Sequence, residues 1–417
     1  MISLNSYRPD LAKDSTFRNY VPYIAIVLIL FIIIVCTIIR IKYGFWYYQP
    51  VFHLYDLRYY IFPPGIIQEE LPRENKFTNF KQIQTIPFKK VTDYQLTQFV
   101  NFVRKHYYSN KDNKYSPKKE NIVPYFKEPY KYDGYLSLFE EEVLLQDMKD
   151  DSQIKDKNII AVMTSRPLNV FIRDKRYGGT FDVYYVDYLC VHKDYRKKGT
   201  APQIIQTHEY NQRHTNKSVC VSLFKREGEL TGIVPLCVYK TYCFSCVGWK
   251  CPHPMHASYT IVECTPQNLH LFHDFLKENQ SKFDISITTS VSNICELIKS
   301  RNVYLLMLLK DGEICAVYFF RNSCMYIANG LKALTCFACI CATSVGDFIQ
   351  GFKHAFWKIA KRERKYGYLV IENISDNYSI IKNIELKTRV YAVSPSGYFF
   401  YNFAYHTFDS KKVLIIC

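Results

Sequence analysis

The sequence predicts a mixed α/β domain, of the α+β type, behind a single N-terminal transmembrane helix. Three observations carry this prediction. Residues 21–39 contain no charged side chain. Beyond them, segments with strand and helix patterns alternate in two successive series of similar order. Finally, a chain of 417 residues with 48% apolar and 22% charged residues has the composition of an ordered protein with one large core or two coupled ones.

The apolar segment Val21 to Ile39 is long enough to cross a bilayer. At about 1.5 Å per helical residue it spans roughly 28 Å, close to the thickness of the hydrocarbon layer. The alternative is a cleaved signal peptide, which has a shorter apolar core and small residues before its cleavage site. Here a polar start, residues 1–20, precedes the segment, and Arg40 and Lys42 follow it. We expect an anchor at 21–39, although basic residues on both flanks leave its orientation open.

The first part of the body carries weaker signals. Residues 44–64 are rich in Tyr, Phe and Pro without a clear period, which predicts an extended arm packed against the domain. Apolar residues at helical spacing predict a helix over 94–108, and residues 109–119 follow as a charged loop. The acid-rich stretch 140–157 is interpreted as a surface helix and loop.

From residue 159 onward the pattern alternates between strand and helix. The first series has strands at 159–164, 181–191 and 217–223, with a helix at 202–214. The second series has helices at 268–279 and 291–301, a hairpin of 304–309 and 314–320 that turns at Asp311-Gly312, a helix at 345–364 and a strand at 368–372. The similar order suggests an internal duplication, with halves at 40–235 and 236–417.

The net charge of +16 and the pI near 9.0 favour an anionic partner. Nucleic acid, an anionic membrane face and a phosphorylated cofactor such as coenzyme A all fit. No nucleic-acid-binding motif stands out, and the basic residues are spread along the chain, so we expect no nucleic-acid partner.

The fifteen cysteines lie mostly within apolar segments of a long chain, which favours reduced thiols in a cytosolic compartment over a disulfide framework. One cluster could hold zinc, because it combines a CxxC with further soft ligands: Cys243, Cys246, Cys251, His253 and His256. No second CxxC or HxxxH follows it, and small core residues next to a surface loop are the alternative. We expect no metal.

The stretch Tyr188 to Pro202 carries the strongest chemical signal. A strand ending Tyr188-Leu189-Cys190-Val191 leads into a turn with Arg196-Lys197-Lys198-Gly199, and Thr200-Ala201-Pro202 opens a helix. The unpaired N–H groups of a first helical turn and the helix dipole attract a phosphate. The three basic side chains supply mobile positive charge, and Gly199 lets the backbone approach closely. An ordinary basic turn is the alternative.

This run, YLCVHKDYRKKGTAP, resembles the acyl-CoA-binding motif of the protein N-myristoyltransferases, and its Arg-x-x-Gly-x-Ala core looks like the wider acetyltransferase superfamily. Four more segments resemble the same family in its order: the arm Phe45-Trp46-Tyr47-Tyr48-Gln49-Pro50-Val51, the lid at 107–117, Tyr401-Asn402-Phe403, and the apolar end 413–417. The resemblance implies two acetyltransferase-like halves that form one saddle-shaped sheet flanked by helices. It makes 40–235 the acyl-CoA half and 236–417 the peptide half, with a catalytic C-terminus.

The resemblance also implies the reaction. A myristoyl chain passes from myristoyl-CoA to the N-terminal glycine of a protein, without a covalent enzyme intermediate. The backbone N–H groups of Tyr188 and Leu189 would hold the oxyanion, and Cys190 would be structural rather than nucleophilic. The C-terminal carboxylate of Cys417 would be the general base, a frayed end being the alternative. The implied cofactor-binding residues are Phe45, Trp46, Gln49, Tyr188, Leu189, Cys190, Val191, Arg196, Lys197, Lys198, Gly199, Thr200, Ala201 and Pro202.

The match weakens on the peptide side. Asp187 stands where the family usually has Asn, and the lid is Ser109-Asn110-Lys111-Asp112-Asn113-Lys114, basic instead of acidic. The segments 224–232 and 394–397 also depart from the family's pattern. Two alternatives therefore remain: an inactive relative that binds acyl-CoA or protein at a membrane, and an acetyltransferase-like enzyme with another donor or amine. Because myristoyl-CoA is cytosolic, the leading hypothesis places the body on the cytosolic side of the membrane.

Overall fold

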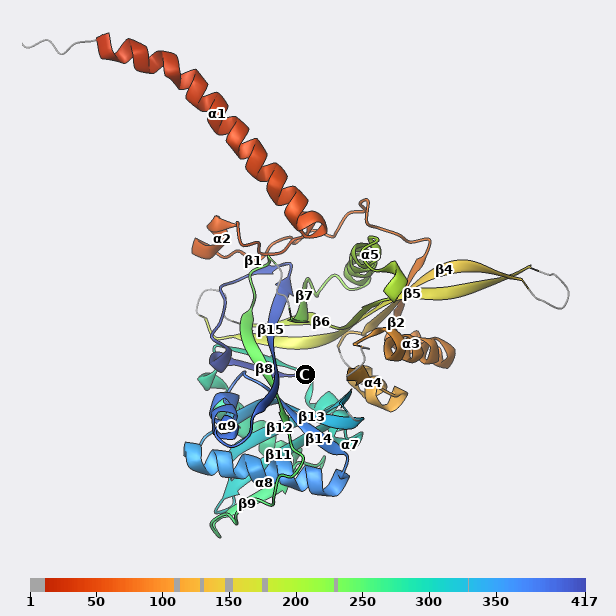
Figure 1. Cartoon of the computed structure of the whole chain (residues 1–417), viewed down its shortest axis with the longest axis vertical. Helices are drawn as coiled ribbons and strands as arrows, with labels where there is room; N and C mark the ends of the chain where they lie inside the picture. Colours follow the sequence, from red (N-terminus) through yellow and green to blue (C-terminus); the bar gives the residue numbers. More distant parts are fainter. Residues whose placement is uncertain are drawn as a thin grey trace, which may run out of the picture. The chain divides into compact units, whose positions relative to one another are not determined.

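The computed structural model describes residues 12–108, 113–127, 131–146, 153–174, 179–228, 232–328 and 330–417, and the chain divides into two compact units, Met1–Gln49 and Pro50–Cys417 (Figure 1). The first unit holds the long helix α1 (Ala12–Tyr43) and the short 3₁₀ helix η1 (Gly44–Tyr48). By length and composition, the helical stretch Tyr20–Tyr48 could cross a membrane. The helix expected at 21–39 is therefore present and extends beyond both predicted ends.

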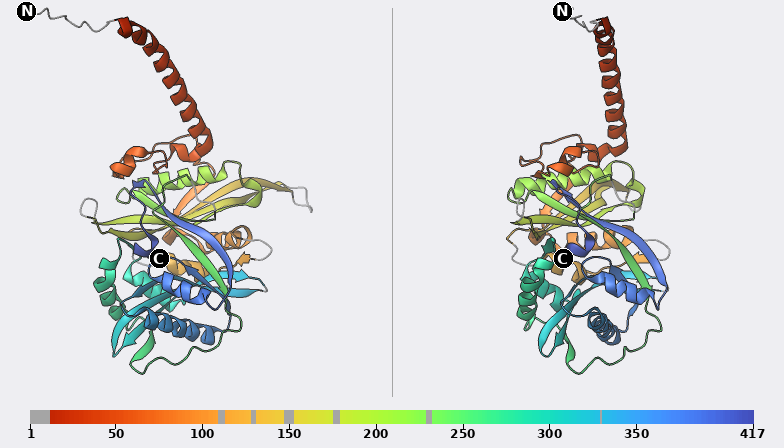
Figure 2. Two further views of the ribbon diagram at one scale, coloured as in Figure 1. Left: turned by 60° about the vertical axis from the view of Figure 1, so that its left-hand side comes forward. Right: turned by 90° about the vertical axis from the view of Figure 1, so that its left-hand side faces the viewer.

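The second unit is built on one large sheet that runs through both halves of the chain (Figure 2). Its main path has the order β17-β10-β5-β6-β7-β15-β8-β14-β13-β12-β11-β9. The strands are β2 (Ile83–Pro87), β3 (Asn113–Tyr115), β4 (Tyr135–Gln146), β5 (Gln153–Ile172), β6 (Gly179–Val191), β7 (Val221–Glu227), β8 (Cys237–Ser245), β9 (Tyr259–Glu263), β10 (Ile285–Thr288), β11 (Val303–Lys310), β12 (Glu313–Ile327), β13 (Leu331–Cys341), β14 (Tyr366–Glu372), β15 (Val390–Tyr401) and β17 (Val413–Ile416). A separate pair joins β1 (Gly65–Ile66) to β16 (Phe403–Ala404).

The two halves repeat one pairing scheme, as the duplicated order predicted. In the first half β5 and β6 are antiparallel, β6 and β7 parallel, and β7 and β15 antiparallel. In the second half the same sequence of contacts joins β12 to β13, β13 to β14, and β14 to β8. A helix makes each parallel crossover: α5 (Thr200–Thr215) in the first half and α8 (Val345–Glu363) in the second.

Strand exchange joins the halves into one body. β15, near the end of the chain, pairs with both β7 and β8, and the last strand β17 lies parallel to β10, which pairs with β5. The remaining helices pack against the sheet through buried apolar side chains. They are α3 (Asp93–His106), α4 (Lys119–Phe126), α6 (Leu269–Asn279), α7 (Val291–Lys299) and α9 (Asn377–Glu385). The predicted mixed α/β fold with one sheet and flanking helices is confirmed.

Most predicted elements are present, and the hairpin between β11 and β12 turns at Asp311 and Gly312, both with positive φ. Three predictions differ. Of the stretch 140–157, expected as a helix and loop, residues 140–146 and 153–157 form the ends of β4 and β5, which pair with each other from Tyr135 to Gln146. Residues 147–152 lie outside the described residues. Cross-strand pairing thus overrides a weak helical pattern.

The other two differences concern boundaries and local turns. The strand expected at 217–223 begins only at Val221, because the side chain of Asn216 accepts the N–H of Ser218 and closes a turn after α5. The arm 44–64 contains η1 and the short helix α2 (Leu57–Ile61), so it is only partly extended. Its middle is packed as expected: Val51 and Phe52 are buried, and Val234 N–H donates to Phe52 C=O at 2.7 Å.

Candidate functional site

The turn between β6 and α5 has the backbone of an anion site. Lys197 (φ 61°) and Gly199 (φ 81°) occupy the left-handed region, and Gly199 is the N-cap of α5. A Cβ at position 199 would meet no atom within 4 Å, so the space in front of this glycine is open. The Thr200 hydroxyl donates to Tyr195 C=O at 2.9 Å and fixes the helix start. The first N–H groups of α5 therefore face an open space at the positive end of the helix dipole.

The three basic residues of this turn differ in role. The Arg196 guanidinium donates to Val191 C=O at 3.2 Å and to His106 C=O at 2.8 Å, so it ties the turn to the ends of β6 and α3. Lys197 and Lys198 are exposed. These two lysines, rather than Arg196, keep the mobility that was expected of all three.

The parallel strands β6 and β7 separate just before this turn. They pair only from Val183–Val221 to Val186–Phe224, after which β7 continues along β15 and β6 keeps β5 as its partner. A bulge at Asp187 interrupts the β5–β6 ladder at the same point. Past the bulge, His192 N–H donates to Ile160 C=O, and strand alternation then directs the N–H of Leu189 away from β5. From Asp187 onward, the edge of β6 that faces away from β5 therefore no longer pairs with β7.

The side chains of this strand end pack under α3 and α4. Tyr188 lies edge-on to Phe99 at 5.6 Å, and its hydroxyl is 2.7 Å from that of Tyr115. Cys190 is buried among the same side chains, and burial raises the pKa of its thiol to about 12. A thiol this weakly acidic is a poor nucleophile near neutral pH, which favours the structural role expected for Cys190.

The C-terminus is part of the sheet. β17 pairs with β10 from Val413 to Ile416, and Thr289 N–H donates to Ile416 C=O at 3.0 Å. Cys417 is only 3% exposed and belongs to the same buried cluster as Tyr185 and Tyr398. The chain end lies in the interior of the body unit (Figures 1 and 2). A frayed end is thus ruled out, and the last carboxylate is carried on buried, ordered backbone.

Buried charges surround this end. Burial raises the pKa of the Cys417 thiol, while Arg166 and Arg321 lower it and Asp187 and Glu372 raise it, which places all four groups within electrostatic range. Arg166, 1% exposed, pairs with Asp187 at 2.7 Å across β5 and β6. Burial raises the pKa of Asp187 despite this partner.

Glu372 is the centre of the second group. Its carboxylate accepts from Arg321 at 2.6 Å, from Lys225 at 3.1 Å and from the Tyr239 hydroxyl at 2.7 Å. Burial would raise the pKa of Glu372, but the two cations hold it below its usual value. These contacts link β7, β8, β12 and β14, so the network crosses between the halves of the sheet.

Sequence reasoning missed Arg321 and Glu372. Each is a single charge within an otherwise apolar strand, as Arg321 is after Ala316-Val317-Tyr318-Phe319-Phe320 and Glu372 is after Tyr368-Leu369-Val370-Ile371. A lone charge on a strand with a buried pattern requires a buried partner, and that signal could have drawn attention to them. Their pairing could not be read, because the partners lie on strands far apart in the chain.

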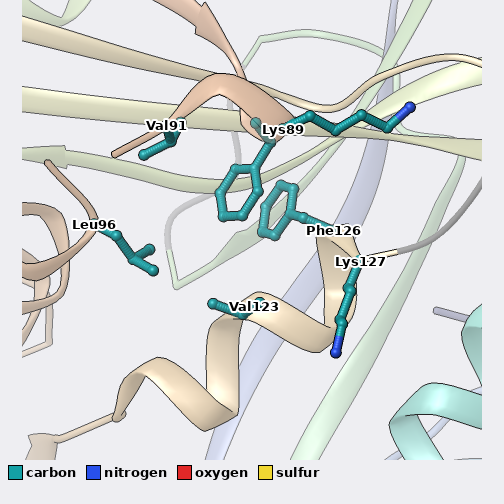
Figure 3. A pocket seen from close by; sticks show the side chains of 7 residues that line it. Lys89, Val91, Leu96, Val123, Phe126 and Lys127 are labelled. Atoms are coloured by element: carbon teal, nitrogen blue, oxygen red, sulfur yellow. The ribbon is translucent and has the colours of Figure 1, made fainter. Parts of the chain in front are cut away.

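A cavity of about 430 Å³ lies between η2 (Phe88–Lys90), α3 and α4 (Figure 3). The stacked rings of Phe88 and Phe126, 4.1 Å apart, form one wall. The remaining lining residues are Lys89, Val91, Leu96, Val123 and Lys127. The walls are mainly apolar, and both lysines point their ammonium groups away from the hollow (Figure 3). Leu96 lies one helical turn from Phe99, which contacts Tyr188, so the cavity and the open edge of β6 share one helix.

The other predicted segments have separate outcomes. Phe45, Trp46 and Gln49 belong to the N-terminal unit, so their place over a cofactor stays a prediction. The tip of the lid, 109–112, lies outside the described residues. Asn402 has a structural task, because its amide donates to Gln68 C=O and Cys220 C=O. Within the described ranges, no three His, Cys, Asp or Glu side chains form a group that could hold a metal ion.

A family model matches most of the first half. Residues 78–237 match the family model described as Myristoyl-CoA:protein N-myristoyltransferase, N-terminal domain. This part of the chain is similar to the N-terminal domain of N-myristoyltransferases. The matched residues begin shortly before β2, end at the first residue of β8 and include the whole β6–α5 turn. A comparison with curated protein sequences finds no match.

Solved structures extend the N-myristoyltransferase likeness to the rest of the fold. Saccharomyces cerevisiae N-myristoyltransferase with bound myristoyl-CoA is 13% identical, with a TM-score of 0.66 over 88% of this chain and 94% of that one. The same yeast enzyme with myristoyl-CoA and inhibitors is 12% identical, with a TM-score of 0.67 over 90% and 94%. A tandem GNAT protein from the clavulanic acid biosynthesis pathway is 10% identical, with a TM-score of 0.51 over 78% and 100%. At these identities the likeness shows the fold, that of N-myristoyltransferases and tandem acetyltransferases.

Proposed function

We propose that this chain transfers a myristoyl chain from myristoyl-CoA to the N-terminal glycine amine of a protein. The observation that carries the proposal is the buried C-terminal residue, which packs with Tyr185 of β6 close to the point where β6 and β7 separate. Burial of a main-chain carboxylate costs free energy, and a role in the reaction accounts for that cost. It supplies a general base where an acyl donor held by β6 would present its thioester.

The donor's diphosphate binds at the β6–α5 turn. N–H groups of α5 and the dipole of a 16-residue helix attract it, and Lys197 and Lys198 add mobile charge. The left-handed Gly199 leaves room for a phosphate oxygen against the backbone. The thioester carbonyl then lies along the open edge of β6, where the N–H group of Leu189 stabilises its developing negative charge, whereas the same strand alternation directs the N–H group of Tyr188 towards β5.

The acyl chain lies under α3 and α4. The side chains there are apolar, and the cavity lined by Leu96, Val123 and Phe126 offers space one helical turn beyond Phe99. Replacing Leu96 by Trp fills this space. Transfer of myristoyl should then fall relative to transfer of a shorter acyl chain, and an unchanged chain-length preference would remove the cavity from the acyl path.

The reaction needs one base and no covalent enzyme intermediate. The Cys417 carboxylate takes a proton from the glycine ammonium, and the free amine attacks the thioester carbonyl. A carbon–nitrogen bond forms, the carbon–sulfur bond breaks, and the thiolate of coenzyme A leaves with the proton that the collapse of the intermediate releases. Because the terminal residue is buried and ordered, the carboxylate is held in a fixed position from which it acts as a base.

The helix α1 anchors the enzyme in a membrane as a single-pass protein, with the body on the cytosolic side where myristoyl-CoA is found. The stretch Tyr20–Tyr48 has the length and composition that this requires. Resistance of the full chain to alkaline carbonate extraction tests the anchor, and protection of the body from protease in sealed vesicles tests its side.

An inactive relative that binds acyl-CoA or protein is the second candidate. The Arg166–Asp187 pair favours it, because a buried ion pair stands beside the oxyanion strand where the resembled family usually has Asn. One assay separates the two candidates: the full chain in detergent is incubated with labelled myristoyl-CoA and an array of peptides that begin with glycine. Transfer to any peptide supports the enzyme, whereas tight binding without transfer supports the relative.

A further inference from the structure

The segment that follows the anchor exposes an unusual run of apolar side chains. α2 and its flanks present Leu57, Ile61 and Phe62 to solvent at 74%, 67% and 65% exposure, and Leu54 at 49%. Leu57 and Ile61 are four residues apart on α2, so they share one face of the helix, and Leu54 is exposed in the turn that precedes it. Arg58, also exposed, lies on the same side, and Phe62 extends the face beyond the helix end.

This apolar face is held rigidly by the opposite side of α2. Phe52, which is buried, contacts the rings of Tyr59 at 5.7 Å and Tyr60 at 4.8 Å. Asp56 accepts the N–H of His53 at 2.8 Å, and Leu54 N–H donates to Gly232 C=O at 3.3 Å. The exposure of Leu57, Ile61 and Phe62 is therefore not that of a loose chain. Their side chains are exposed on a helix whose other side is packed, and this helix lies beside β1 (Figure 1).

Chain connectivity restricts what can cover this face. Leu57 follows the last residue of α1, Tyr43, by fourteen residues, which reach at most about 50 Å even when extended. The intervening residues include Phe45, Trp46, Tyr47 and Tyr48, and aromatic residues of this kind concentrate where a membrane helix leaves the hydrocarbon layer. Arg40, Lys42 and Arg58 supply positive charge for anionic head groups along the same segment.

We propose that the face formed by Leu54, Leu57, Arg58, Ile61 and Phe62, the α2 face, inserts into the interfacial layer of the membrane that α1 spans. A short apolar face with a basic residue at its edge, on an element that does not cross the bilayer, is the chemistry of an interfacial contact. This inference rests on the proposed anchor. It adds a second, shallow contact, which holds the body against the membrane surface, so that an acylated product is released next to the bilayer.

The test places a fluorophore on the α2 face of the full chain. Ile61→Trp is made in a Trp46→Phe background, because Trp46 borders α1 and would respond to lipid by itself. The matched control is Leu386→Trp in the same background, since Leu386 is apolar and 82% exposed but belongs to the second half. Both proteins are reconstituted into phosphatidylcholine–phosphatidylserine vesicles with and without lipids brominated in their acyl chains.

The inference predicts that Ile61→Trp adds a blue-shifted emission that brominated lipid quenches, and that the emission added by Leu386→Trp is unaffected. Equal melting temperatures in detergent show that both variants are folded. If the chain resists carbonate extraction and the emission from position 61 is not quenched, the proposed membrane contact of the α2 face is wrong, whereas the proposed anchor is supported. If carbonate extracts the chain, the anchor fails and the α2 face fails with it.

Discussion

At the scale of single residues, the most specific feature is Gly199, because its backbone conformation and its place at the proposed diphosphate site both favour glycine. Its φ of 81° is costly for any residue with a Cβ, and its open front is where the proposed diphosphate approaches. Gly199→Ala should destabilise the fold by about 1 kcal/mol and weaken binding of myristoyl-CoA at least about tenfold, since the methyl group enters the phosphate space. Isothermal titration of the detergent-solubilised chain measures the binding.

A matched control separates strain from binding. Gly248 has the same φ of 81° and also nothing within 4 Å of a Cβ, but it lies in the loop after β8. Gly248→Ala should show the same loss of stability with unchanged binding. Equal binding losses in both variants would show that the effect at position 199 is strain alone.

The lysines of the turn should act through charge. Replacing Lys197 and Lys198 together by Ala should weaken acyl-CoA binding about tenfold at low salt, and the difference from the wild type should shrink as salt screens the two charges. The double variant Lys250→Ala/Lys277→Ala removes two exposed lysines from the second half and serves as the control. If both double variants weaken binding equally, the overall charge of the protein, not the turn, attracts the donor.

At the scale of elements, α5 carries a group whose titration is coupled to folding. Glu209 is buried, and desolvation raises its pKa to about 7 although Arg213 and the Ser222 hydroxyl oppose the rise. Ionisation of a buried carboxyl group costs free energy in the folded state, so the folded protein loses stability as Glu209 ionises. Its contribution is full below about pH 4.5 and is lost as the pH rises towards 7, to a total of about 3 kcal/mol.

Glu209→Gln should remove this dependence, because the amide keeps the shape without ionising. The melting temperature of the variant should match the wild type near pH 4.5 and exceed it at pH 8. Buried His208, whose pKa is lowered to about 4, has the opposite dependence but is common to both proteins and cancels in the comparison. A constant difference across this range would mean that Glu209 titrates normally.

The elements also show where sequence reasoning succeeds. The strand β6, the turn and α5 could be predicted closely, because a buried strand, a left-handed glycine and a helix start each have a local cause in the sequence. The pairing of β4 with β5 over residues 140–146 and 153–157 could not, since the two strands stabilise each other and neither has a strong pattern of its own. The short helix α2 was missed for a related reason: packing on Phe52, not propensity, fixes it.

At the scale of the whole molecule, the Glu372 network joins the two halves. It gathers Lys225 from the first half and Tyr239 and Arg321 from the second around one buried carboxylate. Glu372→Gln removes the carboxylate that pairs with Arg321 and leaves Lys225 with Glu227 alone, so it should cost about 3 kcal/mol. The melting temperature of the full chain in detergent measures the loss.

Glu385→Gln is the control for this change, because Glu385 pairs with Lys382 on the exposed side of α9. It should leave the melting temperature unchanged. A Glu372→Gln protein as stable as the control would mean that the network does not hold the halves together.

The arrangement of the whole molecule also explains which residues of the site could not be predicted from the sequence. The positions of Tyr188, Leu189 and Gly199 follow from one contiguous segment, so they could be predicted. Arg166, Asp187, Arg321 and Glu372 come together near Cys417 only because β15 and β17 exchange between the halves, and no local pattern encodes that exchange. Burial of the last residue was foreseeable from its apolar tail, but its charged surroundings were not.

The central claim is that the α-carboxylate of Cys417 is the base, and the chain's own end allows one direct measurement. A thioester of residues 1–416 ligated to cysteine amide differs from the native chain by that single charge, and ligation to cysteine itself is the control. We predict that the amide binds myristoyl-CoA normally but transfers the acyl chain to a glycine peptide roughly a hundredfold more slowly, or worse. Equal rates for the two ligated chains would contradict the proposed mechanism.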